Sequence, residues 1–431
     1  MTVGAIVRRF SEAFLREYPH TPPTVVRTLE DLSRCRTAAL GGHVRRCNHC
    51  GLIDYRYHSC GNRHCPQCGG LKRAAWLEKR RSELLDAPYF HVVFTLPHTL
   101  GALVLGNRQV LYSLLFEAAA HTLLEVAANP RHLGARVGVL AVLHTWGQQL
   151  EHHPHVHCVV PGGGLACDQD GVVEQPWRWQ SCRPNFFLPV KVLGQVFRGK
   201  YVAGLRRAYA RGELQFAGST AELADSAAFE AFLGGQYAKD WVVYAKAPFG
   251  GPEQVLKYLT GYTHRVALSN SRLMDMTDQE VTFSWKDYKA ECQRKEMTLS
   301  GVEFLRRFCL HILPRGLVRI RQYGLLANRD RSERLARCRA LLGMPEPAPV
   351  KPAVPECRLA LGWFLLGWVL LSSGSGELLA AGLQALALSL AAGPEDACPW
   401  CGGCGWETLW QAERPRGGGV AVGRGKGIDS S

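Results

Sequence analysis

The hydrophobic and polar positions of this chain follow two different periods, which predicts a mixture of helices and strands. A spacing of three to four residues between apolar positions is typical of amphipathic helices. It occurs in the N-terminal segments VRRFSEAFLREY and TVVRTLEDLSRC, and at 107–128, 190–211, 221–237 and 301–312. Short β-branched and aromatic runs that end at proline, glycine or polar residues predict strands. They lie at 89–96, 137–146, 155–160, 241–246, 266–268 and 281–285.

These elements predict an α+β fold, with an antiparallel sheet and packed helices in a domain from residue 88 to residue 335. Residues 1–87 are expected to form a separate N-terminal domain. The proline-rich stretch MPEPAPVKPAVPE at 344–356 predicts a linker. Residues 357–431 are expected to contain an apolar helical segment and a disordered glycine-rich tail. The apolar run at 359–371 is shorter than the about 20 residues of a membrane span, so we expect a helical hairpin and no membrane partner.

Composition and charge narrow the class of protein. The 431 residues are 47% hydrophobic and 20% charged, which excludes a fully disordered chain. Lys and Arg outnumber Asp and Glu by 51 to 37, which favours a polyanionic partner, although a merely basic protein fits equally well. The N-terminus lacks the continuous apolar segment of a secretory signal, so a reducing cytoplasmic location is expected and the 16 cysteines indicate metal binding rather than disulfides.

Cysteines cluster in two C-x-x-C pairs that lie 14 residues apart, Cys47–Cys50 and Cys65–Cys68. This spacing is close to that of a zinc site with four thiolate ligands, which would be structural. Cys60 lies between the pairs and could replace one of the four thiolates. Flanking arginines and lysines suggest that this module touches DNA, although a solvated charged helix explains them nearly as well. Cys398, Cys401 and Cys404 could supply half of a second zinc site, but no fourth ligand is evident.

Histidines cluster in the segment HTWGQQLEHHPHVH at 144–157. On a strand, His155 and His157 point to the same face, as a two-point metal clamp requires. If 137–146 and 155–160 form a hairpin, His144 sits opposite His157 and completes a site with three imidazoles. Gln148, Gln149 and Asp240 remain alternative third ligands. Three imidazoles accept Zn²⁺, Mn²⁺ or Co²⁺, whereas Mg²⁺ or Mn²⁺ suits phosphate chemistry.

Two tyrosines, Tyr258 and Tyr262, share one face of a predicted helix. A tyrosine next to a bound metal ion can attack a phosphodiester and remain covalently attached. Such a pair is far more often a packing feature, and it gains weight here only beside the histidine clamp. The cations expected to contact DNA phosphates flank these tyrosines or lie in the segment HILPRGLVRIRQYG. They are Lys257, His264, Arg265, Arg319 and Arg321.

Four strings together resemble the rolling-circle transposases of bacterial insertion sequences, the IS91 family of the HUH-type tyrosine endonucleases. They are CNHCG with SCGNRHCPQC, HTWGQQLEHHPHVHCVVPGGG, WVVYAKAPFGGPEQVLKYLTGYTHRVALSN and HILPRGLVRIRQYGLLANR, and they cover about residues 40–330. The resemblance implies an N-terminal zinc-binding domain and a metal-dependent nicking domain. It also implies that His155 and His157 bind the catalytic metal, that His144 is their third partner, and that Tyr258 and Tyr262 occupy the nucleophile positions.

The resemblance implies a transposase that nicks and joins single-stranded DNA at the ends of its element and in its target. A tyrosine would form a 5′-phosphotyrosine with the help of Mg²⁺ or Mn²⁺, while Zn²⁺ would be structural. The sequence contains no GxxxxGK[ST] nucleotide-binding loop, so a host helicase and polymerase are expected partners at the bacterial nucleoid. Two alternatives remain, namely a replication initiator or relaxase with the same chemistry, and a non-catalytic zinc DNA-binding protein.

Overall fold

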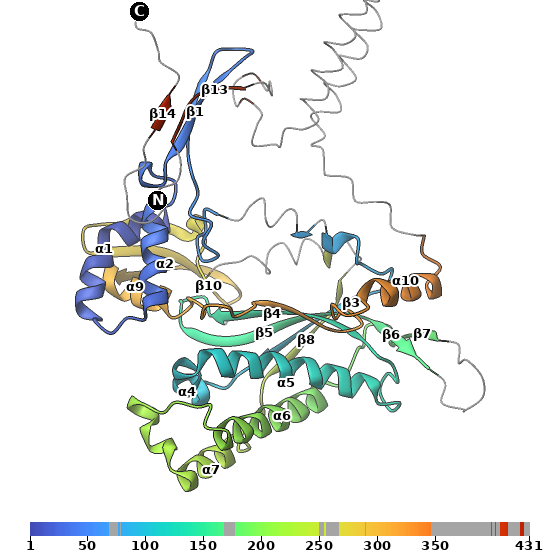
Figure 1. Ribbon diagram of the computed structural model, residues 1–431. Coiled ribbons are helices and arrows are strands. Elements are labelled where there is room, and N and C mark those ends of the chain that lie inside the picture. The colour runs from blue at the N-terminus through green and yellow to red at the C-terminus, as the bar shows by residue number, and fades with distance from the viewer. Residues whose placement is uncertain are drawn as a thin grey trace, which may run out of the picture. The chain divides into compact units, whose positions relative to one another are not determined.

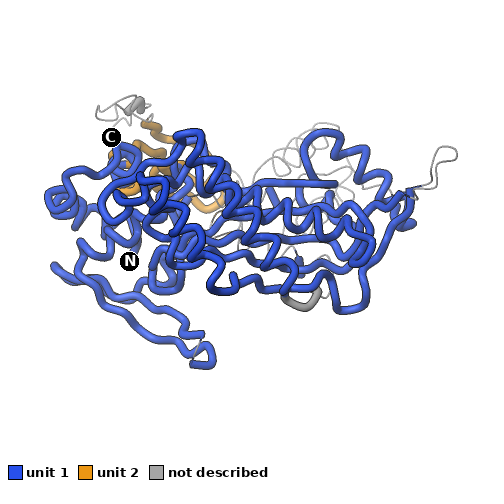
Figure 2. Tube along the Cα trace, turned by 90° about the horizontal axis from the view of Figure 1, so that it is seen from below, with its two compact units in different colours: residues 1–30, 62–348 blue, residues 31–61, 349–431 orange. Residues whose placement is uncertain are grey.

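The computed structural model consists of two compact units (Figure 2). Unit 1 comprises residues 1–30 and 62–348, and unit 2 comprises residues 31–61 and 349–431. The structure describes residues 1–68, 76–77, 79–167, 177–249, 254–255, 267–288, 290–345, 398, 401, 406–412 and 423–425.

The centre of unit 1 is a five-stranded antiparallel sheet with the strand order β12-β4-β5-β3-β8. Its strands are β3 (Tyr89–Thr95), β4 (Gly138–Trp146), β5 (His152–Pro161), β8 (Val243–Phe249) and β12 (Ile320–Gly324). The central strands are apolar along most of their length because both faces of the sheet are covered.

Helices cover one face of this sheet (Figure 1). They are α4 (Gly101–Gly106), α5 (Arg108–Ala128), α6 (Val190–Ala210) and α7 (Ser226–Gly235). Alternate residues of β4 and β5, such as Val139 and Val156, pack against these helices in the main hydrophobic core.

Among the described residues, α5 is the one helix long and apolar enough to cross a membrane. Its most apolar 18-residue stretch is 67% buried inside the protein, as expected for a core helix.

A second, three-stranded sheet of unit 1 has the order β11-β10-β9, formed by β9 (Leu273–Met276), β10 (Glu280–Asp287) and β11 (Gln293–Ser300). Helices α1 (Val3–Glu17) and α9 (Gly301–Cys309) lie together beside it (Figure 1). Phe304 of α9 meets Phe283 of β10 edge to face, with ring centroids 5.9 Å apart. Other described elements of unit 1 include the ribbon of β6 (Gly163–Ala166) and β7 (Arg178–Ser181), and helix α10 (Arg331–Leu341).

Unit 2 contains a four-stranded antiparallel sheet with the order β14-β13-β1-β2. Two of its strands are early in the sequence, β1 (Gly42–Cys47) and β2 (Ile53–Tyr57), and two are late, β13 (Trp406–Ala412) and β14 (Gly423–Gly425). Strand β13 pairs with β1 along six residue pairs, from Gly42 opposite Ala412 to Cys47 opposite Trp406. Helix α2 (Pro23–Arg34) runs across the sequence boundary between the two units.

The predicted α+β class is confirmed, as are the helices at 107–128, 190–211 and 301–312. The strand predicted at 266–268 is wrong for its described part, because Ala267 and Leu268 form a bend. Strand β14 falls within the tail expected to be disordered; it pairs with β13, which in turn pairs with the distant β1. The linker prediction at 344–356, apart from its first two residues, and the apolar run at 359–371 lie outside the described residues.

Candidate active site and metal centres

Three histidines from adjacent strands converge on the sheet face opposite α5 and α6. His144 on β4 pairs directly with His155 on β5, and His157 lies two residues further on the same face of β5. One ring nitrogen of each histidine lies within 4.8 Å of the others. The structure therefore brings together the three imidazoles that the sequence predicted, and three nitrogen ligands at this spacing fit a divalent transition-metal ion.

The predicted register of the hairpin was wrong by two residues. His144 lies opposite His155, and Val142 lies opposite His157. The hairpin closes in a tight turn from Gly147 to Glu151, in which Leu150 has a positive φ of 62°. A shift of two residues keeps every side chain on the same face of the sheet, which is why the histidine group forms in spite of the error.

Hydrogen bonds orient two of these imidazoles. The Nδ1 atom of His155 lies 2.6 Å from the carbonyl oxygen of His153 and donates to it, which leaves Nε2 with a lone pair for a metal. The Nδ1 atom of His157 lies 2.8 Å from Nε2 of His91. Burial lowers the pKa of His155 to about 4, so this ring is neutral at pH 7, as a ligand must be.

His91 was not predicted from the sequence. It is a buried histidine in the otherwise apolar strand β3, whose alternating residues place it on the same face as the triad. A titratable residue inside an apolar strand was the available signal. Because its Nε2 lies 2.8 Å from Nδ1 of His157, His91 holds the orientation of that imidazole.

Aromatic packing braces His144. The ring of Trp146 stacks on that of His144, with centroids 4.5 Å apart and an interplanar angle of 21°. The guanidinium carbon of Arg319 lies 5.7 Å from the centre of the same tryptophan ring. Buried His311 holds the turn between β4 and β5 in place, because its Nε2 lies 3.1 Å from the carbonyl oxygen of Leu150. Burial lowers the pKa of His311 to about 4.

The triad opens into a pocket of about 670 Å³ that lies between the large sheet and strand β10. The end of β10 and the turn after it supply aromatic and basic residues to the wall of this pocket, namely Trp285 and Lys286 of β10 and Tyr288 just beyond it. The amide side chain of Gln148 joins the two sides, because its Nε2 donates to Tyr288 Oη at 3.2 Å and its Oε1 accepts from the Lys286 backbone at 3.3 Å. The pocket thus combines cations with aromatic rings, the two kinds of group that proteins use to contact phosphates and unpaired bases.

Of the alternative third ligands, Asp240 does not belong to the histidine group among the described residues, whereas Gln148 and Gln149 line the same pocket as the three histidines. Gln148 is engaged with the β10 side of the pocket. The carboxylate of Asp240 is 98% exposed and lies 3.8 Å from Arg198.

The predicted nucleophiles and three of the predicted DNA contacts lie outside the described residues. These are Tyr258, Tyr262, Lys257, His264 and Arg265. Of the other two predicted DNA contacts, Arg319 lies near the triad. Arg321 projects from the opposite face of the sheet, where it donates to Ser113 Oγ of α5 at 3.0 Å and lies 4.5 Å from the centre of the Phe116 ring.

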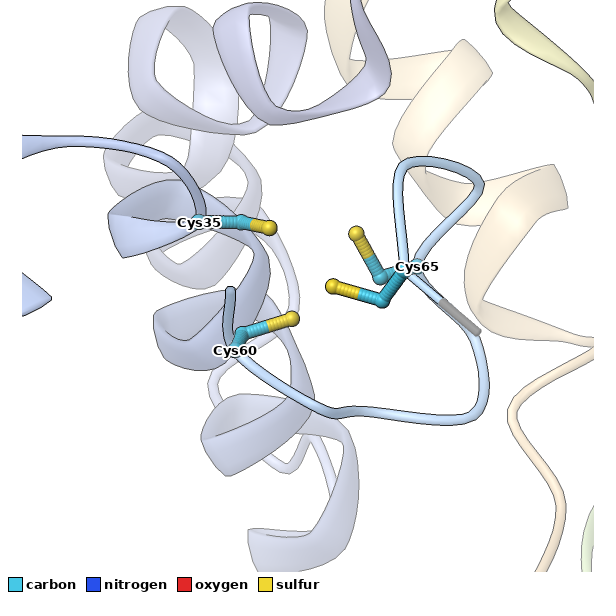
Figure 3. A group of neighbouring side chains, drawn as sticks. Cys35, Cys60 and Cys65 are labelled. Atoms are coloured by element: carbon cyan, nitrogen blue, oxygen red, sulfur yellow. The ribbon is translucent and has the colours of Figure 1, made fainter. Parts of the chain in front are cut away.

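The predicted zinc ligands do not form one set in the structure; they belong to two separate groups of four cysteines. In the first group, Cys65 and Cys68 join Cys35 and Cys60, with all four sulfur atoms within 4.8 Å of one another. Figure 3 shows the side chains of Cys35, Cys60 and Cys65 pointing toward a common centre. Cys60, expected only as a substitute, is a full member. Cys35 was not predicted because it is an isolated cysteine, 12 positions before Cys47 and outside any C-x-x-C pair.

In the second group, Cys47 and Cys50 join Cys398 and Cys401. The sulfur of Cys47 lies 3.6 Å from that of Cys401, and the sulfur of Cys50 lies 3.6 Å from that of Cys398. Groups of four cysteines at these spacings fit structural zinc, which is held tetrahedrally by thiolates.

Comparisons with known proteins show which families this chain is similar to. Residues 138–334 match a family described as "Putative transposase", and residues 6–96 match one described as "Transposase zinc-binding domain". The chain is 50% identical over 354 residues to the "Putative transposase y4qJ" of Sinorhizobium fredii, covering 82% of this chain and 87% of that protein. It is 30% identical over 330 residues to the "Transposase for insertion sequence element IS801" of Pseudomonas savastanoi pv. phaseolicola, covering 75% of each. No solved structure matches.

Proposed function

This chain belongs to the IS91 family of insertion-sequence transposases, and from that premise we propose that it nicks and rejoins single-stranded DNA by means of a tyrosine and a divalent metal ion. The observation that carries the proposal is the convergence of His144, His155 and His157 at the base of a pocket lined by cations and aromatic rings. A transposase has to break a phosphodiester bond, and this is the described site whose groups suit that reaction.

The three histidines would hold the metal through nitrogen atoms. An all-imidazole set suits Mn²⁺ better than Mg²⁺, which prefers oxygen ligands. When bound, such an ion supplies a positive charge that stabilises the charge developing on the scissile phosphate. His91 and the carbonyl of His153 would keep two imidazoles in the required orientation throughout the reaction.

The nucleophile would be Tyr258 or Tyr262. Its hydroxyl oxygen attacks the scissile phosphorus while the bond from phosphorus to the 3′ oxygen breaks. The phenolic proton passes to solvent, and the departing 3′ oxygen takes up a proton. The products are a 5′-phosphotyrosine and a free 3′-hydroxyl. The energy of the broken bond is retained in the phosphotyrosine, so a 3′-hydroxyl can attack it and rejoin the strand.

The wall formed by β10 would hold the single strand beside the triad. Unpaired bases can stack on exposed rings, and Tyr288 is 66% exposed. Lys286 is exposed next to it and supplies a cation for the phosphate backbone. Because a duplex buries its base faces, this wall favours single-stranded over double-stranded DNA.

The test is nicking of a labelled single-stranded oligonucleotide that carries the end sequence of the element. We expect a protein–DNA adduct that survives SDS, requires added metal ion and disappears in the double variant Tyr258→Phe/Tyr262→Phe. Each single variant then assigns the first nucleophile. An adduct that persists in the double variant would refute the nucleophile assignment, and a wild-type protein that binds the oligonucleotide with metal but forms no adduct would refute the nicking proposal.

A further inference from the structure

The pair Cys47 and Cys50 lies in unit 2, and no partner from its own sequence neighbourhood completes a metal site with it among the described residues. The two other ligands come from Cys398 and Cys401, about 350 positions later in the chain. We propose that these four thiolates bind a second zinc ion, so that the C-terminal segment completes the N-terminal zinc-binding domain.

The sulfur spacing supports a metal ion rather than disulfides. The sulfur–sulfur distances Cys47–Cys401 and Cys50–Cys398 are both 3.6 Å. A disulfide bond is about 2.05 Å long, so these atoms are not bonded. With Zn–S bonds of about 2.3 Å, tetrahedral geometry separates the sulfurs by about 3.8 Å, which is close to the observed value.

The backbone explains why the two pairs meet. Cys47 ends β1, and the following turn closes when the Gly51 backbone donates to the Cys47 carbonyl at 2.9 Å, with Gly51 at a φ of 75°. In the paired strand, Trp406 lies directly opposite Cys47, five residues after Cys401. The antiparallel register therefore delivers both C-x-x-C pairs to the same end of the two strands.

Contacts along the two strands hold that register independently of a metal. The guanidinium carbon of Arg45 lies 4.2 Å from the centre of the Trp406 ring, and its Nε also pairs with Asp54 at 3.0 Å. Next to it, Arg46 pairs with Glu407 on the facing strand at 2.6 Å. The C-terminal pair is thus fixed beside Cys47 and Cys50 by specific side-chain contacts as well as by backbone pairing.

The proposal is tested on the wild-type chain by measuring how fast each cysteine is alkylated by iodoacetamide, with mass spectrometry as the readout. Cys50 and Cys401 are both exposed, so burial does not protect their sulfur atoms. Exposed Cys292 belongs to none of the cysteine groups and serves as the internal control. We expect Cys292 to react at least tenfold faster than Cys50 and Cys401 in the zinc-loaded protein, and the three rates to converge after treatment with a chelator. Equal rates in the zinc-loaded protein would overturn the proposal.

Metal content provides a second test. In the background His155→Ala/His157→Ala, which removes the histidine group that also accepts Zn²⁺, we expect two zinc ions per chain, one per chain after Cys398→Ser/Cys401→Ser, and two after Cys167→Ser/Cys292→Ser. The variant Cys401→His supplies a different zinc ligand and should keep two ions, with a Co²⁺ absorption spectrum changed from four sulfur ligands to three. Two zinc ions in the Cys398→Ser/Cys401→Ser variant of this background would contradict the assignment. This outcome is separate from nicking, because neither measurement depends on DNA.

Discussion

Nε2 of His91 lies 2.8 Å from Nδ1 of His157, and the two rings are stacked with centroids 5.0 Å apart. This contact fixes the imidazole of one proposed metal ligand from a strand that contributes no ligand itself. Removal of such a supporting group typically weakens metal binding about 10- to 100-fold. We therefore expect His91→Ala to raise the dissociation constant for Mn²⁺ by that factor, as measured by calorimetric titration.

Two further variants separate positioning from general damage to the fold. His91→Gln retains a side-chain hydrogen-bond acceptor for the Nδ1–H of His157 and should recover part of the lost affinity. His121→Ala removes an exposed histidine of α5, on the opposite side of the sheet, and should bind Mn²⁺ like the wild type. Unchanged Mn²⁺ affinity in folded His91→Ala would show that the contact does not support the metal site.

The β10 wall of the pocket leads to a prediction about DNA affinity. Stacking of one base on an aromatic side chain contributes about 1–3 kcal/mol, so Tyr288→Ala should weaken single-strand binding by roughly 5- to 150-fold. Lys286→Ala should lower the slope of log affinity against log salt by about 0.7, the contribution of one phosphate contact. Fluorescence anisotropy with a labelled oligonucleotide at several salt concentrations measures both effects.

The matched control for the stacking prediction is Tyr237→Ala, which removes a tyrosine that is 44% exposed and follows α7 on the helical side of the sheet. It should leave the dissociation constant for DNA unchanged. Equal loss of affinity in Tyr237→Ala and Tyr288→Ala would mean that β10 does not form the binding wall.

Arg321 was predicted to contact DNA, but its surroundings indicate a packing role. Its guanidinium group contacts Ser113 and Phe116 of α5. A hydrogen bond and a cation–π contact each contribute about 1 kcal/mol, so Arg321→Ala should lower the free energy of unfolding by about 1–2 kcal/mol. Denaturant unfolding measures this loss, and exposed Arg211→Ala is the control. A loss of DNA affinity in folded Arg321→Ala, without a loss of stability, would restore the original prediction.

Glu303 provides a prediction about pH. Hydrogen bonds from Arg306 and then Arg307 hold the pKa of this carboxyl at about 2, below its ordinary value of 4.5. A depressed pKa in the folded state stabilises the protein above pH 4.5, and this stabilisation disappears as the pH falls from about 4.5 to 2. Glu303→Gln should therefore lower the melting temperature at pH 7, and the difference from wild type should shrink toward pH 2.

The expected size of the Glu303 effect is about 1 kcal/mol or less at pH 7, because the carboxylate is partly exposed and its ion pairs are screened by solvent. Calorimetry between pH 2.5 and pH 7 measures it, and Glu296→Gln, at an exposed position of β11, is the control. A difference from wild type that grows as the pH falls would contradict the assigned direction of the pKa.

Local pattern was sufficient to predict the main helices and the strands that carry the histidine triad. The apolar run of β4 and the histidines of β5 lie only a tight turn apart, so the sequence contains both the strands and their partnership. The sequence did not predict the register between β4 and β5, because the conformation of the turn at Leu150 determines which residues face each other. The triad was predicted correctly because the error in the register was two residues. Only a shift by an odd number of residues would have moved His144 to the other face of the sheet.

The cysteine groups show where local pattern fails. Cys47 and Cys65 were assigned to one site because they lie close in sequence, yet the structure pairs the first with Cys401 and the second with Cys35. The position of a cysteine in the sequence does not show which distant cysteines lie beside it in the fold. Here the pairing of β1 with β13 brings Cys47 and Cys401 together. For the same reason the charge of Arg321 did not reveal that it faces α5.

The most direct measurement of the central claim is the yield of covalent protein–DNA adduct in the double variant His155→Ala/His157→Ala, in single-turnover conditions with Mn²⁺. We expect the wild type to form the adduct only with metal, and the variant to form it at least about 100-fold more slowly while binding single-stranded DNA with comparable affinity. Adduct formation at the wild-type rate in this variant, or an equal rate in wild type after complete metal removal, would show that the three histidines do not hold the ion that supports nicking.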